Sequence, residues 1–148
     1  MRITYDNEVD AMYIYFPPAG PEAVGRTESH QELKIEMDAN NQIIALQLFE
    51  SNEFQLGPSL RYALQNPEAV YDEEGRTLRV EFAPGIEAKR AVQWSANIDM
   101  NQEGQLVGIE LLFGERLTGH DKLAYISPHL IPFDDPYFEV KVGDAQSN

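Results

Sequence analysis

The chain has 148 residues and a formal net charge of −14, and this length predicts one domain with a substantial core. The absence of cysteine excludes a disulfide scaffold, a thiol nucleophile and cysteine-ligated metals, and the low content of Lys and Arg argues against binding to nucleic acid. No stretch approaches the roughly 20 apolar residues of a membrane helix, so we expect a soluble cytoplasmic protein with no membrane partner.

The chain opens on a stretch, residues 3–16, in which Asp6, Glu8 and Asp10 stand at alternate positions before an alternating apolar run. Such a stretch could be a metal site, a cluster of catalytic acids or the turn of a β-hairpin. A calcium loop also needs a following glycine and a distant bidentate Glu, and this stretch matches only the first part of that pattern. We predict a hairpin turn in which Asp6 accepts hydrogen bonds from nearby backbone N–H groups.

Alternating apolar side chains predict strands in six segments: 11–16, 33–37, 42–49, 77–82, 96–100 and 105–112. Residues 57–66 are predicted to form a short linking helix, with Pro58 in its first turn and Pro67 ending it. Residues 114–136 are punctuated by Pro and Gly and are expected to be irregular. Residues 137–142 alternate again and are predicted to form a closing strand.

The chain contains an internal repeat, because residues 5–16 recur at 71–82 and residues 35–48 recur at 98–111. We therefore predict a mainly β fold with minor α content, built as two tandem antiparallel β-meander repeats. The repeats are expected to share one core and to be related by approximate two-fold symmetry. The predicted units of this single domain, 1–148, are repeat 1 (3–52), the linking helix (57–66), repeat 2 (69–116) and a C-terminal extension (117–148).

The repeat provides a test of the acidic stretch. Arg76 stands in the second copy where Asp10 stands in the first, and a cation site built by the repeat would not place a guanidinium at a ligand position. Asp72 is the counterpart of Asp6 and is predicted to form the same turn. Before the last strand of each copy, Asn41 is equivalent to Gly104, and both residue types tolerate a positive φ, which predicts a tight turn there.

The Tyr-Asp pair followed by an alternating strand, and the segment GQLVGIEL at 104–111, resemble the domain of unknown function 2283 family in two tandem copies, 3–52 and 69–116. The first copy departs from the pattern, with Ala45 and Gln47 where Gly108 and Glu110 stand. The resemblance implies a small bacterial β-rich protein without assigned activity. Some members are encoded beside small toxin-like proteins, which implies an antitoxin-like binding role. The resemblance transfers no catalytic residue.

No residue is assigned to catalysis, to a metal or to a cofactor. Glu36 and Asp99 fall on strand faces opposite the apolar set, so they are predicted to be solvated rather than to act as a buried acid–base pair. The three histidines, His30, His120 and His129, have no ligand spacing and no twin in the other copy.

One face of the first copy is unusually apolar and is the candidate interaction surface. Tyr13 and Tyr15 alternate with the core residues of their strand, whereas the second copy has Arg79 and Glu81 at these positions. Together with Ile43 and Phe49 they predict a second apolar face, which requires a cover. The cover could be the extension 117–148, a second copy of the chain, or a ligand or foreign partner.

Two classes of function stay open. The first is a non-enzymatic acidic protein-interaction module, antitoxin-like, that binds a basic protein or itself as a homodimer. The alternative is a small-molecule-binding protein, or an enzyme, with a site at the junction of the two repeats.

Overall fold

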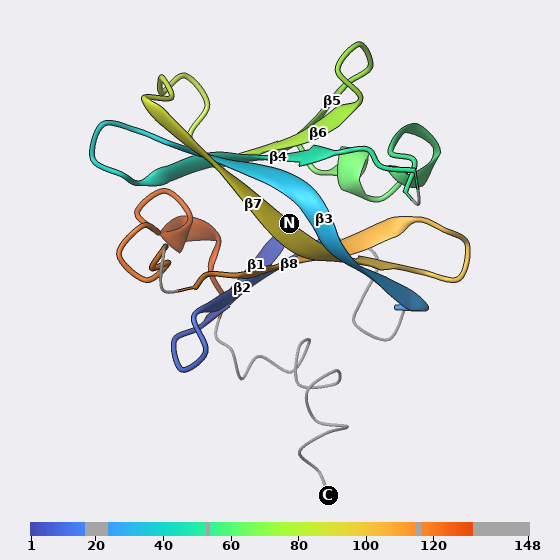
Figure 1. The fold of residues 1–148 in the computed structure, drawn as a ribbon, viewed down its shortest axis with the longest axis horizontal. Coiled ribbons are helices and arrows are strands. Elements are labelled where there is room, and N and C mark those ends of the chain that lie inside the picture. Colours follow the sequence, from blue (N-terminus) through green and yellow to red (C-terminus); the bar gives the residue numbers. More distant parts are fainter. Residues whose placement is uncertain (17–23, 53, 115–116, 132–148) are drawn as a thin grey trace, which may run out of the picture.

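The computed structural model describes residues 1–16, 24–52, 54–114 and 117–131. They form one antiparallel sheet of eight strands in the order β1-β2-β8-β7-β3-β4-β6-β5 (Figure 1). This confirms the predicted mainly β, antiparallel fold. The strands are β1 (Arg2–Asp6), β2 (Ala11–Tyr15), β3 (Arg26–Met37), β4 (Ile43–Phe49), β5 (Ala69–Asp72), β6 (Thr77–Glu81), β7 (Arg90–Met100) and β8 (Leu106–Leu112).

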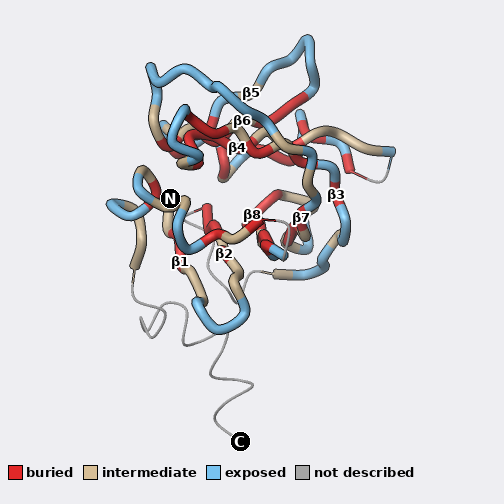
Figure 2. Tube along the Cα trace, turned by 60° about the vertical axis from the view of Figure 1, so that its left-hand side comes forward, coloured by how far each residue is buried: buried red, intermediate tan, exposed pale blue. Residues whose placement is uncertain are grey.

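The sheet is curled, so that its two ends face each other. In Figure 2, β4, β5 and β6 lie above β1, β2 and β8, and the long strands β3 and β7 connect the two layers. The inner face encloses one hydrophobic core. Its buried members include Met12, Ile14, Phe16, Leu33, Ile35, Met37, Leu46, Leu48, Leu78, Val80, Ile98, Met100, Ile109 and Leu111. Among the described residues, no helix is long and apolar enough to cross a membrane.

The pairing of the strands differs from two separate meanders. In a meander β2 would lie beside β3, but β2 pairs with β8 of the second repeat, and β6 pairs with β4 of the first. The repeats therefore exchange their first hairpins. The reason is the long central pairing of β3 with β7, which places the last hairpin of each repeat beside the first hairpin of the other.

When each strand of the first repeat is exchanged with its counterpart in the second, the strand order is the original order read from the opposite end of the sheet. Individual hydrogen bonds also recur. The N–H of Phe16 donates to the carbonyl of Val107 at 3.2 Å. In the other half, the N–H of Phe82 donates to the carbonyl of Ile44 at 2.8 Å. A two-fold relation would produce these equivalences, and the rotation itself stays a prediction.

A β-bulge interrupts the last hairpin of each repeat. The register shifts so that Met37 pairs with Ile43 in the first repeat, and Met100 pairs with Leu106 in the second. A bulge adds one residue to one strand, which bends that strand and re-aims its side chains. Ile43, which strict alternation places on the outer face, accordingly belongs to the core and is fully buried.

The linking segment is not the single helix that was predicted for 57–66. It consists of two 3-10 turns, η2 (Gly57–Ser59) and η3 (Ala63–Gln65). The segment docks on the turn between β7 and β8 through the side chain of Gln105. The Gln105 amide donates to the carbonyl of Pro58 at 2.9 Å, and its oxygen accepts from the N–H of Arg61 at 2.9 Å.

The described part of the C-terminal extension, 117–131, docks in the equivalent way on the turn between β3 and β4. The side chain of Gln42 donates to the carbonyl of Asp121 at 2.9 Å and accepts from the N–H of Ala124 at 2.9 Å. Gln42 is the counterpart of Gln105, so the extension takes the place that the linking segment has in the other half. The repeat therefore extends further than the sequence comparison indicated. The predicted closing strand 137–142 lies outside the described residues.

Candidate functional site

The acidic stretch at the start of the chain is a hairpin turn, as predicted. The Asp6 carboxylate accepts from the N–H of Glu8 at 2.9 Å, and in the second repeat the Asp72 carboxylate accepts from the N–H of Glu74 at 3.1 Å. These bonds fix the turn between β1 and β2 and the equivalent turn between β5 and β6. Within the described ranges, no group of three or more His, Cys, Asp and Glu side chains is placed to hold a metal ion.

Asp10 serves to attach the C-terminal extension. Its backbone is left-handed, with φ of 53°, and so is that of its counterpart Arg76, with φ of 52°. The Asp10 carboxylate accepts from the N–H of Gly119 at 3.1 Å and from the hydroxyl of Tyr5. Burial, and then the hydrogen bond to Asp10, raise the pKa of Tyr5 above its ordinary value. The position that could have been a metal ligand is thus used to hold the extension.

A polar cluster joins the two repeats on the outer face of the sheet. Tyr13 of β2 reaches across Gly108 of β8, and its hydroxyl donates to the Asp99 carboxylate of β7. Thr27 of β3 donates to the other oxygen of Asp99 at 2.5 Å. A methyl group at Gly108 would overlap the Tyr13 ring, so glycine is what allows this approach. Burial, and then the Asp99 charge, raise the pKa of Tyr13 well above its ordinary value.

The equivalent cluster in the other half is an ion pair. Arg79, the counterpart of Tyr13, donates to Glu36, the counterpart of Asp99, and to Glu81 at 2.9 Å. Burial alone would lower the pKa of Arg79, but its bonds to the two carboxylates outweigh burial and raise that pKa. Asp99 is 6% exposed and the Glu36 side chain is 12% exposed, so both acids are paired and largely buried rather than solvated.

The four residues predicted to form an apolar interaction surface do not lie together on the surface. Tyr15 and Ile43 are fully buried within the chain itself. Tyr13 is partly buried, with its ring 4.8 Å from that of Tyr15. Phe49 lies elsewhere, with the Lys34 ammonium 5.8 Å from its ring centre. Tyr15 and Ile43 therefore contribute nothing to the surface of the described chain, whereas Tyr13 and Phe49 are partly exposed.

Of the three covers considered for that face, the structure describes residues 117–131 of the C-terminal extension. The described part of the extension hydrogen-bonds to Ile3, to Asp10 and to the turn 38–43. In the last of these contacts, the Tyr125 hydroxyl donates to the Asp38 carboxylate at 2.9 Å. The extension thus completes the sheet edge and a turn, while Tyr13 is held by Asp99.

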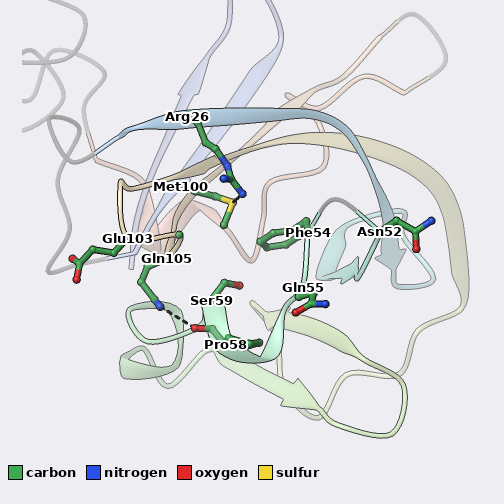
Figure 3. Close-up of a pocket in the computed structure, with 10 residues that line it drawn as sticks. Arg26, Asn52, Phe54, Gln55, Pro58, Ser59, Met100, Glu103 and Gln105 are labelled. Carbon is green, nitrogen blue, oxygen red and sulfur yellow. Dashed lines mark hydrogen bonds between the residues drawn. The ribbon is translucent and has the colours of Figure 1, made fainter.

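A cleft of about 480 Å³ lies between the linking segment and the turn that connects β7 to β8 (Figure 3). Arg26 extends into it from the start of β3, with its Nη2 3.5 Å from the sulfur of Met100. Phe54, which lies between β4 and the linking segment, faces Met100. One end of the cleft is closed by the hydrogen bond from Gln105 to Pro58. The cleft is lined by residues of both repeats, and Glu103 lies in it together with Arg26. The Arg26 guanidinium is also paired with Glu28, at 3.3 Å.

An acidic sheet edge is the feature that sequence reasoning missed. Around β5, Asp72, Glu73 and Glu74 are exposed and Glu68 is partly exposed, and the side chain of Val70 is 47% exposed. β5 pairs only with β6 among the described strands. The signal was present in the sequence as four acids within seven residues, but the topology was needed to show that this strand lies at an edge.

Comparison with known proteins concerns the family alone. A family model described as a protein of unknown function, DUF2283, matches residues 2–50 and 69–113, which together make up more than half of the chain. Neither the curated proteins nor the solved structures gave a match. The two matched segments coincide with the two sets of four strands. The chain therefore belongs to the DUF2283 family and contains two tandem copies of the family's domain.

Proposed function

We propose that the protein is a non-enzymatic, acidic protein-interaction module that binds a basic protein, in the manner of an antitoxin. The observation that carries this proposal is the distribution of charge. The polar groups that converge on the sheet are occupied by one another, as in the pairs Tyr13–Asp99 and Arg79–Glu36. The acidic excess lies instead on exposed turns and edges, including Glu8, Glu73 and Glu74.

An acidic surface of this kind attracts a basic partner and accelerates its association, and salt weakens the attraction. A homodimer is the alternative partner, and a net charge of −14 on each chain opposes it. The proposal keeps the cytoplasmic location expected from the sequence.

The experiment is an affinity capture from cells that express the tagged chain, followed by mass spectrometry at low and at high salt. We expect one stoichiometric partner with a high pI, which is lost as the salt concentration rises. Recovery of the chain alone, or of a partner whose capture does not respond to salt, would refute the proposal. Fractionation of the same cells tests the location.

A second candidate is a small-molecule-binding protein with its site in the cleft beside Arg26. The specific observation is that this cleft lies at the junction of the repeats and presents a guanidinium above the Phe54 and Met100 side chains. Thermal unfolding measured across a panel of small carboxylates and phosphates tests it. A stabilisation by one compound, abolished in Arg26→Ala and retained in the control Arg61→Ala, would support this function.

A further inference from the structure

We propose that the outer edge of β5 binds an extended, lysine- or arginine-rich segment of the partner by strand addition. This inference rests on the proposed function and specifies where and how the basic partner would bind. It is carried by the contrast between the two terminal strands of the sheet and by the charge around one of them.

The edge at β1 is already occupied. Leu130 of the extension forms a parallel bridge with Ile3, and the N–H of Ile131 donates to the carbonyl of Ile3 at 2.9 Å. The chain thus supplies its own cover for one end of the sheet. An uncovered edge is a ready template for a further strand, and proteins usually protect such edges.

The edge at β5 has no such cover in the part of the chain that the structure describes. The N–H of Glu81 donates to the carbonyl of Glu68 at 2.8 Å, which fixes the alternation of the β5–β6 ladder. By this alternation, Val70 and Asp72 direct their backbone groups towards β6, and Ala69 and Tyr71 direct theirs outwards. The Ala69 N–H is used locally, donating to Asn66 at 3.0 Å. Among the described residues, the Ala69 carbonyl and both backbone groups of Tyr71 have no strand beside them, so they remain for an added strand.

The charge around β5 selects the occupant. Asp72 ends the strand, Glu73 and Glu74 follow it, and all three are exposed. The neighbouring Arg76 is directed to Glu50, at 3.4 Å, and does not neutralise these acids. Opposite charges on adjacent strands stabilise pairing, and like charges oppose it. A second copy of this chain would bring the same acids to the interface, so the edge favours a basic strand over self-pairing.

The start of β5 adds a recess for a cationic side chain. A pocket of about 310 Å³ is lined by Glu68, Glu81, Phe82 and His129, together with two prolines. The Oε1 atom of Glu68 is buried and has no hydrogen-bond partner among the described residues. A carboxylate next to an aromatic ring suits a guanidinium, which can pair with the first and stack on the second. An arginine near the end of the added strand would fit this recess.

The test uses the full chain and three synthetic peptides with blocked ends. The first peptide alternates Lys and Val, the second alternates Glu and Val, and the third is the Lys–Val peptide with N-methyl groups on alternate residues. The N-methyl peptide keeps the charge but cannot pair along one edge. Binding is measured by titration, and exchange of the Tyr71 amide hydrogen is followed by NMR.

We expect that the Lys–Val peptide alone binds, and that it slows exchange of the Tyr71 amide by about tenfold or more. Glu73→Gln with Glu74→Gln should weaken its binding by about fivefold. The matched control Glu87→Gln with Asp121→Asn removes two exposed charges elsewhere and should leave the affinity unchanged.

Three results would overturn the inference. If the N-methyl peptide binds as tightly as the Lys–Val peptide and the Tyr71 amide is not protected from exchange, the peptides are attracted by charge alone. That result would leave the proposed function standing. If the Glu–Val peptide binds with the same affinity as the Lys–Val peptide, the charge around β5 does not select the strand that binds there. Absence of binding by all three peptides would show that the edge accepts no strand. The capture experiment tests the proposed function independently, because a partner would be captured wherever on the chain it binds.

Discussion

The hydroxyl of Tyr13 in the first repeat donates to the Asp99 carboxylate in the second, across the backbone of Gly108. In the other half of the sheet, Arg79 of the second repeat makes the equivalent contact with Glu36 of the first. Each of these two partly buried polar contacts joins one repeat to the other. The pair differs in chemistry between the halves, but its position is the same.

The first prediction is that Gly108→Ala destabilises the fold by about 1–3 kcal/mol, the usual cost of overpacking. The added methyl group would overlap the Tyr13 ring and push its hydroxyl away from Asp99. The free energy of unfolding in urea measures the effect. The natural control is the equivalent position in the other half, Ala45, where Ala45→Gly should cost less than about 1 kcal/mol.

A second variant shows whether the cost of Gly108→Ala comes from overlap with the Tyr13 ring or from the substitution in general. When Tyr13→Ala is already present, the ring is gone and the added cost of Gly108→Ala should nearly vanish. An unchanged cost in that background would contradict the proposed contact.

The second prediction concerns alkaline pH. An ordinary tyrosine ionises near pH 10, and the folded state raises the pKa of Tyr13 above that value. Both states hold the proton below pH 10, so the contribution to stability is fully present there. Above about pH 10 the unfolded chain releases the proton first, and the stability falls as pH rises.

We therefore expect the free energy of unfolding to decrease between about pH 9.5 and 11, and Tyr13→Phe to reduce that slope. Absorbance at alkaline pH should show that Tyr13 ionises only as the protein unfolds. Tyr5, whose pKa is also raised above this range, is a matched comparison, and Tyr5→Phe should reduce the slope by a similar amount. A slope that does not respond to Tyr13→Phe would refute this prediction.

Local features of the fold followed from the sequence because they depend on neighbouring residues. The turns at Asp6 and Asp72 form as predicted, and the positive φ angles at Asn41 and Gly104 are 61° and 77°. In each case the residue type itself determines the backbone geometry.

The exchange of hairpins could not be predicted in the same way. The alternation of Met12 and Ile14 identifies the inner face of β2 but not its neighbour, because a strand with one apolar face fits beside several others. Pairing of β2 with β8 depends on contacts distant in sequence, such as Tyr13 with Asp99. For the same reason these two residues were assigned separately, one to an interaction surface and one to solvent.

The third prediction concerns acid. The N–H of Gln42 and the hydroxyl of Tyr125 donate to the Asp38 carboxylate and lower its pKa. A carboxyl group with a lowered pKa contributes stability above its unfolded value, and that contribution is lost as pH falls. The equivalent turn contains Asn101, which accepts the same backbone bonds without a charge.

Asp38→Asn should therefore keep the turn and remove part of the loss of stability that occurs below about pH 5. Unfolding midpoints of the natural chain and of the variant, compared from neutral to acid pH, measure the difference. Asp121→Asn is a suitable comparison, because the pKa of Asp121 is also lowered but its carboxylate bonds only to the neighbouring Lys122. If the unfolding midpoints of the natural chain and of Asp38→Asn fall in parallel as the pH is lowered, Asp38 does not contribute to the acid dependence of stability.

The fourth prediction follows from the exchange of hairpins. Suppose that the chain is divided into fragments 1–66 and 67–148. In each fragment, three of the four strands then lose one of their two neighbouring strands. In the first fragment β2 loses β8, β3 loses β7 and β4 loses β6, so its apolar inner face has no counterpart. Neither fragment should fold as a monomer, because the missing strands supply half of the core.

Mixed in equal amounts, the two fragments should assemble into a one-to-one complex with the circular dichroism spectrum of the intact chain. Light scattering after size-exclusion chromatography gives the mass of the complex, and Leu46→Asp in the first fragment, which places a charge in the core, should prevent assembly. A fragment that folds alone as a stable monomer would show that the repeats do not need each other. We expect the opposite result, because every strand except β1 and β5 has one neighbour from the other repeat.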